Sequence, residues 1–197
     1  MTLALSVFSW ISVLGIFNEF FKSRIYKKGK YEFAFTDLFF ITCFILTYSV
    51  FFQTLKGYIT YLVLAWVTTS LFGFFLSYDY LFYKRIKKGR YYLISLPSNL
   101  LFQQTVVCAT VLFINQYCTG ISANLIFGAV FFVLHIPIIF CRWVKLRYLY
   151  LILAFFGGMI FSFLITNYGG FGVTLSFLVH LGFYVPIFYY LRDETKI

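Results

Sequence analysis

Two histidines stand alone within apolar segments of the chain. His135 lies in AVFFVLHIPIIF, residues 129–140, and His180 lies in LSFLVHLGFYV, residues 175–185. An imidazole can ligate a metal, transfer a proton or hold a structural hydrogen bond. Which of these roles applies depends on the solvent around the two segments and on the polar groups beside them.

Other hydrogen-bonding side chains lie at similar distances from the basic segments of the sequence. His135 precedes the next basic segment by seven residues and His180 by twelve, which corresponds to about 10 Å and about 18 Å of helix. Ser98, Asn99 and Gln103 follow the preceding basic segment by eight to thirteen residues. Polar side chains at such depths either bond helices together or line a functional pocket, and the pattern leaves both readings open.

Three carboxylates lie in or beside the apolar segments, and each is close to a basic cluster: Glu19, Asp37 and Asp79. Asp79 lies five residues before Lys84 and is the carboxylate that could serve a catalytic site. Pairing with a nearby lysine is its alternative role. The four cysteines show no CxxC or metal-ligand spacing, so packing is their expected role.

The composition identifies the solvent around these groups. Of the 197 residues, 62% are hydrophobic, 25% are aromatic and 11% are charged. A soluble domain carries about 25% charged residues. Because a water-facing surface cannot be built from this composition, the chain is predicted to be an integral membrane protein.

Apolar stretches of transmembrane length recur along the chain. Each is close to the roughly 20 residues that a helix needs to cross the hydrocarbon core, and none shows the alternation of a membrane strand. The stretches are 2–21, 34–53, 58–82, 97–116, 122–140, 148–166 and 173–191. The sequence therefore predicts an all-α, polytopic bundle of seven spans that forms one membrane domain, residues 1–197.

The basic residues predict the orientation of this bundle. The clusters at 22–30, 84–90, 142–147 and 192–197 hold 15 of the 16 lysines and arginines. The positive-inside rule places such loops in the cytoplasm, so the N-terminus is expected outside and the C-terminus in the cytoplasm. The net charge of +10 then reflects topology and attraction to anionic lipids, and no nucleic-acid partner is expected.

Three segments resemble the motifs of the CAAX protease and bacteriocin-processing (CPBP, or Abi) family of intramembrane metalloproteases. That family carries Glu-Glu-x-x-x-Arg, then Phe-x-x-x-His, then a His followed four residues later by Asn or Asp. SNLLFQ, residues 98–103, stands at the first motif, FFVLH supplies Phe131 and His135, and His180 stands at the third. The resemblance covers residues 91–191 as a CPBP-like core, after three leading spans in residues 1–90. It implies a cavity lined by Ser98, Asn99, Gln103, Phe131, His135, His180 and Tyr184.

The chain departs from the family at the residues that carry its chemistry. In the family the two glutamates act with the histidines around the metal or its water. Here Ser98 and Asn99 replace the glutamates, Gln103 replaces the arginine, and Tyr184 stands where Asn or Asp would follow. A hydrolytic metal site needs ligands and a proton acceptor, so we expect a pseudoprotease without a catalytic or metal-binding site. The candidates for a retained catalytic site are His135, His180 and Asp79.

The expected function is that of a catalytically inactive CPBP-like scaffold or subunit, which binds a transmembrane helix or a lipid. One alternative is an active CAAX-type intramembrane metalloprotease with an altered site. Another is a small membrane subunit of a transporter or other large complex. We expect no cofactor, with zinc only in the active alternative. The expected partners are membrane lipids and another integral membrane protein, and the expected location is the bacterial cytoplasmic (inner) membrane.

Overall fold

The computed structural model describes residues 32–83, 91–136, 139 and 146–190, with backbone alone at 32–34, 74–83, 91–94 and 185–190. The first expected span, residues 2–21, lies outside the described residues. So do the basic clusters at 22–30, 84–90 and 192–197 and most of the cluster at 142–147. Every secondary-structure element in the described part is helical, which confirms the predicted all-α class.

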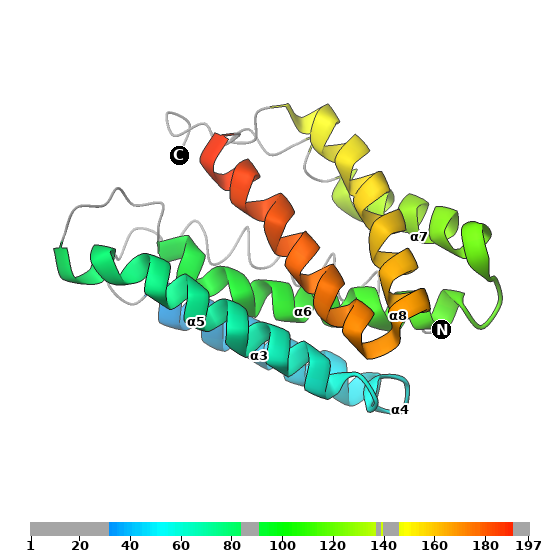
Figure 1. Ribbon diagram of the computed structural model, residues 1–197, viewed down its shortest axis with the longest axis horizontal. Coiled ribbons are helices and arrows are strands. Elements are labelled where there is room, and N and C mark those ends of the chain that lie inside the picture. The colour runs from blue at the N-terminus through cyan, green and yellow to red at the C-terminus, as the bar shows by residue number, and fades with distance from the viewer. Residues whose placement is uncertain (1–31, 84–90, 137–138, 140–145, 191–197) are drawn as a thin grey trace. The chain divides into compact units, whose positions relative to one another are not determined.

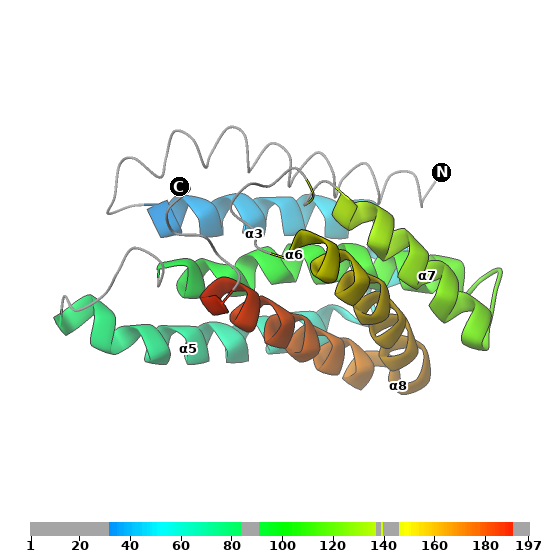
Figure 2. The ribbon, with the colours of Figure 1, turned by 90° about the horizontal axis from the view of Figure 1, so that it is seen from above.

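The chain divides into two compact units between Val106 and Val107, and each is described by itself. In the N-terminal unit, α3, α5 and the first part of α6 run side by side (Figures 1 and 2). The rings of Phe40 on α3 and Phe102 on α6 are fully buried, with centroids 6.2 Å apart. The helices are α3 (Glu32–Val50), α4 (Phe52–Leu55), α5 (Ile59–Tyr83) and α6 (Tyr91–Ile114).

The C-terminal unit contains the rest of α6, α7 (Gly120–His135) and the long α8 (Arg147–Tyr190). α8 consists of two helical halves joined at Gly169, where φ is 55° and ψ is −128°, and the chain reverses direction there (Figure 1). Glycine adopts a positive φ without steric cost. The predicted spans 148–166 and 173–191 leave residues 167–172 as a connection, but helical backbone continues up to Gly169 from both sides.

α7 packs against the first half of α8 through two facing glycines. A Cβ atom added at Gly158 would lie 3.1 Å from Cα of Gly128 and 2.7 Å from Cβ of Phe131. A Cβ atom at Gly128 would lie 2.9 Å from the carbonyl oxygen of Phe155. Small residues at such a crossing allow two helix backbones to approach closely. This contact holds Phe131 against α8.

Two described stretches are long and apolar enough to cross a membrane, judged by length and composition: Ser95–Ile114 and Arg147–Tyr184, of which the second includes the reversal at Gly169. Three further apolar helical stretches are shorter within the described residues: Phe35–Val50, Ile59–Gly73 and Gly120–His135. The number of spans and their orientation stay predictions.

Candidate functional site

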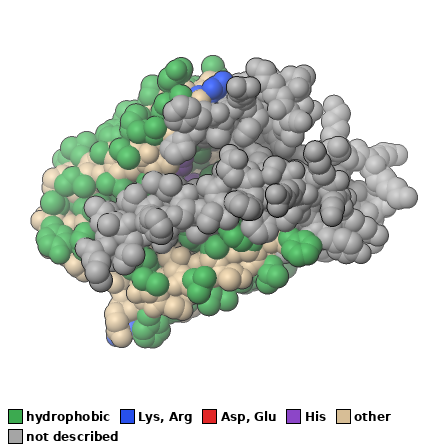
Figure 3. All heavy atoms as spheres, turned by 180° about the vertical axis from the view of Figure 1, so that it is seen from behind, with side chains coloured by type: hydrophobic (Ala, Val, Ile, Leu, Met, Phe, Trp, Pro, Cys, Tyr) green, Lys and Arg blue, Asp and Glu red, His purple; other side chains and the backbone are tan. Residues whose placement is uncertain are grey.

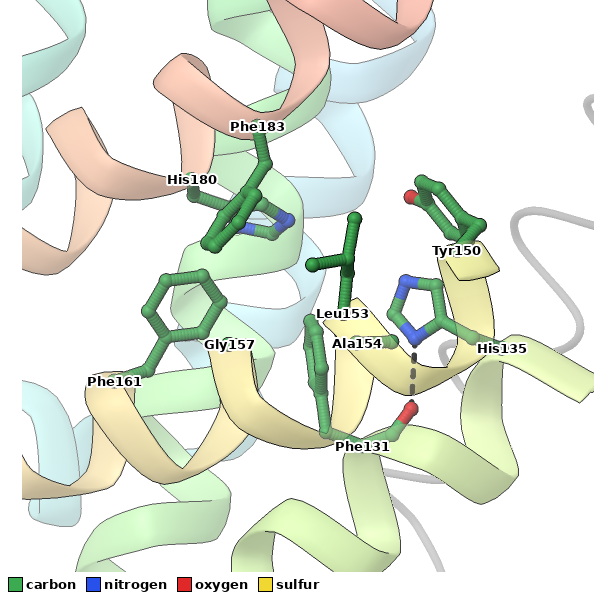
Figure 4. A pocket seen from close by; sticks show the side chains of 9 residues that line it. All are labelled: Phe131, His135, Tyr150, Leu153, Ala154, Gly157, Phe161, His180 and Phe183. Atoms are coloured by element: carbon green, nitrogen blue, oxygen red, sulfur yellow. Dashed lines mark hydrogen bonds between the residues drawn. The ribbon is translucent and has the colours of Figure 1, made fainter. Parts of the chain in front are cut away.

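A pocket in the C-terminal unit is lined by both histidines (Figure 4). Its walls come from α7 and from both halves of α8, so the reversal at Gly169 is needed to form it. Its volume is about 20 Å³, which is room for about one water molecule. The lining residues are Phe131, His135, Tyr150, Leu153, Ala154, Gly157, Phe161, His180 and Phe183.

His135 ends α7 and is held by its own helix. Its Nδ1 lies 2.7 Å from the carbonyl oxygen of Phe131, one turn earlier (Figure 4). Because a carbonyl oxygen can only accept, Nδ1 carries the hydrogen and donates it, and Nε2 is the nitrogen with the lone pair. The imidazole is buried and its centroid lies 5.7 Å from that of Tyr150.

His180 lies on the second half of α8 and is surrounded by aromatic rings. Its centroid lies 4.9 Å from that of Phe161 and 5.4 Å from that of Tyr184. Tyr184 follows one turn later on the same helix and is not among the pocket's described lining residues. Phe131 contacts both imidazoles, with centroids 4.3 Å from His135 and 5.8 Å from His180. The two histidines therefore share an aromatic neighbour.

The polar residues of the SNLLFQ segment lie in the N-terminal unit and have partners there. Nε2 of Gln103 donates to Oδ1 of Asn99 over 2.8 Å, and Nε1 of Trp66 donates to Oγ of Ser98 over 3.2 Å. Ser98, Asn99 and Gln103 are all buried. That these three side chains share a cavity with the histidines stays a prediction, since the structure describes the two units separately.

Of the three carboxylates noted in the sequence, Asp37 lies beside Ser98. The hydroxyl of Ser98 donates a hydrogen bond to the Asp37 carboxyl group. The side chain of Asp79 lies outside the described residues, but its backbone lies on α5 thirteen residues beyond Trp66, which bonds Ser98. This separation is about 20 Å along the helix. The sequence does contain a signal for Asp37. Asp37 follows one basic cluster by seven residues and Ser98 follows the next by eight, so both side chains are expected at a similar depth in the membrane.

The chemistry available to the pocket is limited by its donor groups. His135 and His180 could hold a metal, and Tyr150 adds a phenol. A catalytic zinc site uses three protein ligands of the His, Cys or carboxylate type and an open position for water. Within the described residues, no group of three His, Cys, Asp or Glu side chains is placed to hold a metal ion. The described pocket residues therefore do not match a catalytic zinc site.

The aromatic walls of the pocket were not identified from the sequence. Tyr150, Phe161 and Phe183 come from three different turns of α8, and the chain contains 29 phenylalanines and 17 tyrosines. No spacing distinguishes these three from the other aromatic residues. Only the packing of the helix halves selects them.

The comparisons with known proteins identify no relative. No family model, no curated protein and no solved structure matches the chain. The resemblance to the CPBP family therefore rests on the motif residues alone, and membership in that family stays a prediction.

Proposed function

We propose that the chain is a seven-span integral membrane protein, a catalytically silent relative of the CPBP proteases that binds another component of the membrane. In this proposal the C-terminal unit supplies the binding surface and the histidine pocket maintains its shape. Activity as a protease has been lost with the first motif. The membrane is the bacterial cytoplasmic membrane, with the basic loops on its inner side.

Apolar surface on more than one side of a helix supports a membrane location. α3 buries Phe40 and Phe44 and exposes Leu38 and Leu46, of which 63% and 62% is accessible. A helix that is hydrophobic all round belongs either in a protein core or in a membrane, and exposure excludes the core for these positions. On the face drawn in Figure 3, hydrophobic side chains are spread over much of the described surface.

The observation that carries the loss of catalysis is the hydrogen bond between Asn99 and Gln103. In the family motif the second glutamate and the arginine are four residues apart, which is one helical turn. Here a neutral amide pair occupies that spacing and bonds internally over 2.8 Å. Ser98, at the position of the first glutamate, accepts a hydrogen bond from Trp66. The bond to Ser98 joins α5 to α6, the amide pair bonds within α6, and none of these neutral side chains can act as a carboxylate base.

The pocket around the histidines supports a structural role for the imidazoles. Aromatic rings surround both histidines, and the volume left between the side chains is about 20 Å³. A peptide substrate does not fit such a space, whereas one water does. In the proposed protein the imidazoles pack against Phe131 and fix how α7 meets both halves of α8.

The first half of α8 carries the surface that we assign to the partner. Ile152, Phe156, Ile160 and Phe163 repeat at helical spacing and are 42–54% exposed. A contiguous apolar stripe of this kind fits the side of another transmembrane helix, since i, i+4 and i+8 positions share one face.

The test begins with gentle purification of the whole protein from its native membrane, followed by mass spectrometry of copurifying components and by metal analysis. Phe156→Ala should lower recovery of the partner several-fold because it truncates the stripe. Phe35→Ala on α3 is the matched control, since Phe35 is 55% exposed and Phe156 is 54% exposed. Equal recovery with both variants would contradict the assignment of the surface to α8.

The loss of catalysis is tested with His135→Ala/His180→Ala. This double variant should fold with reduced stability, because it leaves a cavity among buried rings, and should still recover the partner. If it folds and keeps the partner but abolishes cleavage of a membrane substrate that the unmodified protein cleaves, the protein is an active protease with an altered site.

A further inference from the structure

A chain of hydrogen bonds crosses three helices of the N-terminal unit and ends at a carboxylate. Nε1 of Trp66 on α5 donates to Oγ of Ser98 on α6 over 3.2 Å. The hydroxyl of Ser98 hydrogen-bonds the carboxyl group of Asp37 on α3. An indole nitrogen can only donate, so the hydroxyl hydrogen of Ser98 is left to point at Asp37. The hydrogen bonds therefore run in one direction, from the indole through the hydroxyl group to the carboxyl group, which is the final acceptor.

This chain leaves one oxygen of Asp37 unsatisfied. Oδ1 is buried and has no hydrogen-bond partner in the part of the chain that the structure describes. Asp37 is half-buried, and its neighbour Phe40, one turn along α3, is fully buried. An ionised carboxyl group within an apolar helix is unfavourable unless a counter-charge or a hydrogen-bond donor accompanies it. A positive charge or a donor at Oδ1 would remove that penalty.

The charge and the donor set determine which ligand fits. The three side chains carry one formal negative charge in total, on Asp37, so one monovalent cation neutralises the group and a divalent cation would leave a net positive charge. Ser98 retains a second lone pair after accepting from Trp66. Carboxylate and hydroxyl oxygens are hard donors that suit a proton or a sodium ion rather than a soft metal.

We propose that Asp37, supported by Ser98 and Trp66, binds one exchangeable monovalent cation, either a proton or a sodium ion, between α3, α5 and α6. This site lies wholly in the N-terminal unit and uses neither histidine. It does not depend on the resemblance to proteases or on the identity of the partner. When the cation binds or leaves, the net charge of the N-terminal unit changes by one. That charge therefore depends on the concentration of the cation on the side of the membrane from which the site is reached.

The test is labelling with dicyclohexylcarbodiimide on the full-length protein in lipid nanodiscs, read by peptide mass spectrometry at Asp37. The reagent takes up the carboxyl proton, the carboxylate oxygen adds to its central carbon, and rearrangement leaves a stable N-acylurea. Only a carboxyl group that holds a proton reacts, so a bound sodium ion protects it. Asp37→Asn is the negative control, and its elution on size exclusion shows whether it folds.

Two arms distinguish the two cations. For sodium, labelling at constant pH should fall by about half at a Na⁺ concentration equal to the Kd, and K⁺ at the same ionic strength should have no effect. For a proton, labelling should be indifferent to Na⁺ and should fall about tenfold per pH unit above its midpoint. Ser98→Ala should weaken protection by Na⁺, since it removes one oxygen from the site.

Three results would overturn the proposal. Asp37 that is unlabelled in the folded protein under all conditions, but labelled after denaturation, would mean that a fixed internal ion pair holds the carboxylate. Labelling that responds to neither Na⁺ nor pH would exclude an exchangeable cation. Thermal unfolding gives a third result. If Na⁺ raises the unfolding temperature of the unmodified protein, and raises that of Asp37→Asn by the same amount, the sodium site lies elsewhere.

Discussion

Replacing Gly158 by alanine tests the close contact between α7 and α8. The added Cβ atom would lie 2.7 Å from Cβ of Phe131 and 3.1 Å from Cα of Gly128. Neither atom is the far end of a flexible side chain, so a helix must shift. Overpacking of this kind costs about 1–3 kcal/mol, while alanine improves helix propensity by about 0.5–1 kcal/mol.

From the midpoints of these two ranges, the expected net loss of stability is about 1 kcal/mol. For a chain of this length, each kcal/mol corresponds to about 2–4 °C in the thermal midpoint, so Gly158→Ala should melt about 2–4 °C lower. The assay is thermal unfolding of the purified protein in mild detergent, followed by intrinsic tryptophan fluorescence. The same displacement moves Phe131, so the pocket next to both histidines should be disturbed as well.

Two other glycines of α8 provide matched controls. A Cβ atom at Gly182 meets nothing within 4 Å, so Gly182→Ala should gain only helix propensity and melt at the same temperature or slightly higher. A Cβ atom at Gly157 would lie 3.4 Å from Cε2 of Phe183, and Gly157→Ala should fall between the two. If Gly158→Ala is as stable as Gly182→Ala, the described approach of α7 and α8 is wrong.

Further predictions concern the N-terminal unit, the topology and the metal content. Asn99→Leu or Gln103→Leu should each lower stability by about 1–3 kcal/mol in thermal unfolding, because each leaves the other buried amide without its hydrogen-bond partner. The double variant should lose less stability than the sum of the two single variants. Strictly additive losses would argue against the bond. In a cysteine-free background, Gly57→Cys and Tyr168→Cys should react with an impermeant maleimide on intact cells, and reaction only after permeabilisation would reverse the proposed orientation. The zinc content measured after purification should be far below one ion per chain, and replacing both pocket histidines by alanine should leave it unchanged. One zinc ion per chain that disappears in this double variant would contradict the proposal that the site is catalytically silent.

The sequence predicted the helical class because its evidence is local. Every polar backbone group within a membrane must be hydrogen-bonded inside the protein, and a helix does this without distant partners. Long apolar runs with few charges therefore indicate helices whatever lies beside them. His135 and His180 could also be singled out locally, as isolated imidazoles in segments such as 129–140 that contain no charge.

Tertiary structure decided which of the predicted side chains meet. Helical spacing shows which residues share a face of one helix, but not which helix that face touches. Asp37 and Ser98 are 61 residues apart in the chain and are joined by a hydrogen bond, whereas Asp79, which looked the better candidate, lies about 20 Å along α5 from Trp66, the α5 residue that bonds Ser98. Register between helices cannot be read from hydropathy.

The same limit applies to the histidine pocket. Phe131 lies against His135 one turn along α7, and it also lies against His180 because Gly128 and Gly158 allow α7 and α8 to cross closely and because the chain reverses at Gly169. Each glycine is ordinary in the sequence, one of thirteen, and only its neighbours in space show that a side chain would not fit. The sequence thus determined the helices and the polar groups within them, while close backbone contacts, which depend on atoms from distant segments, decided the site.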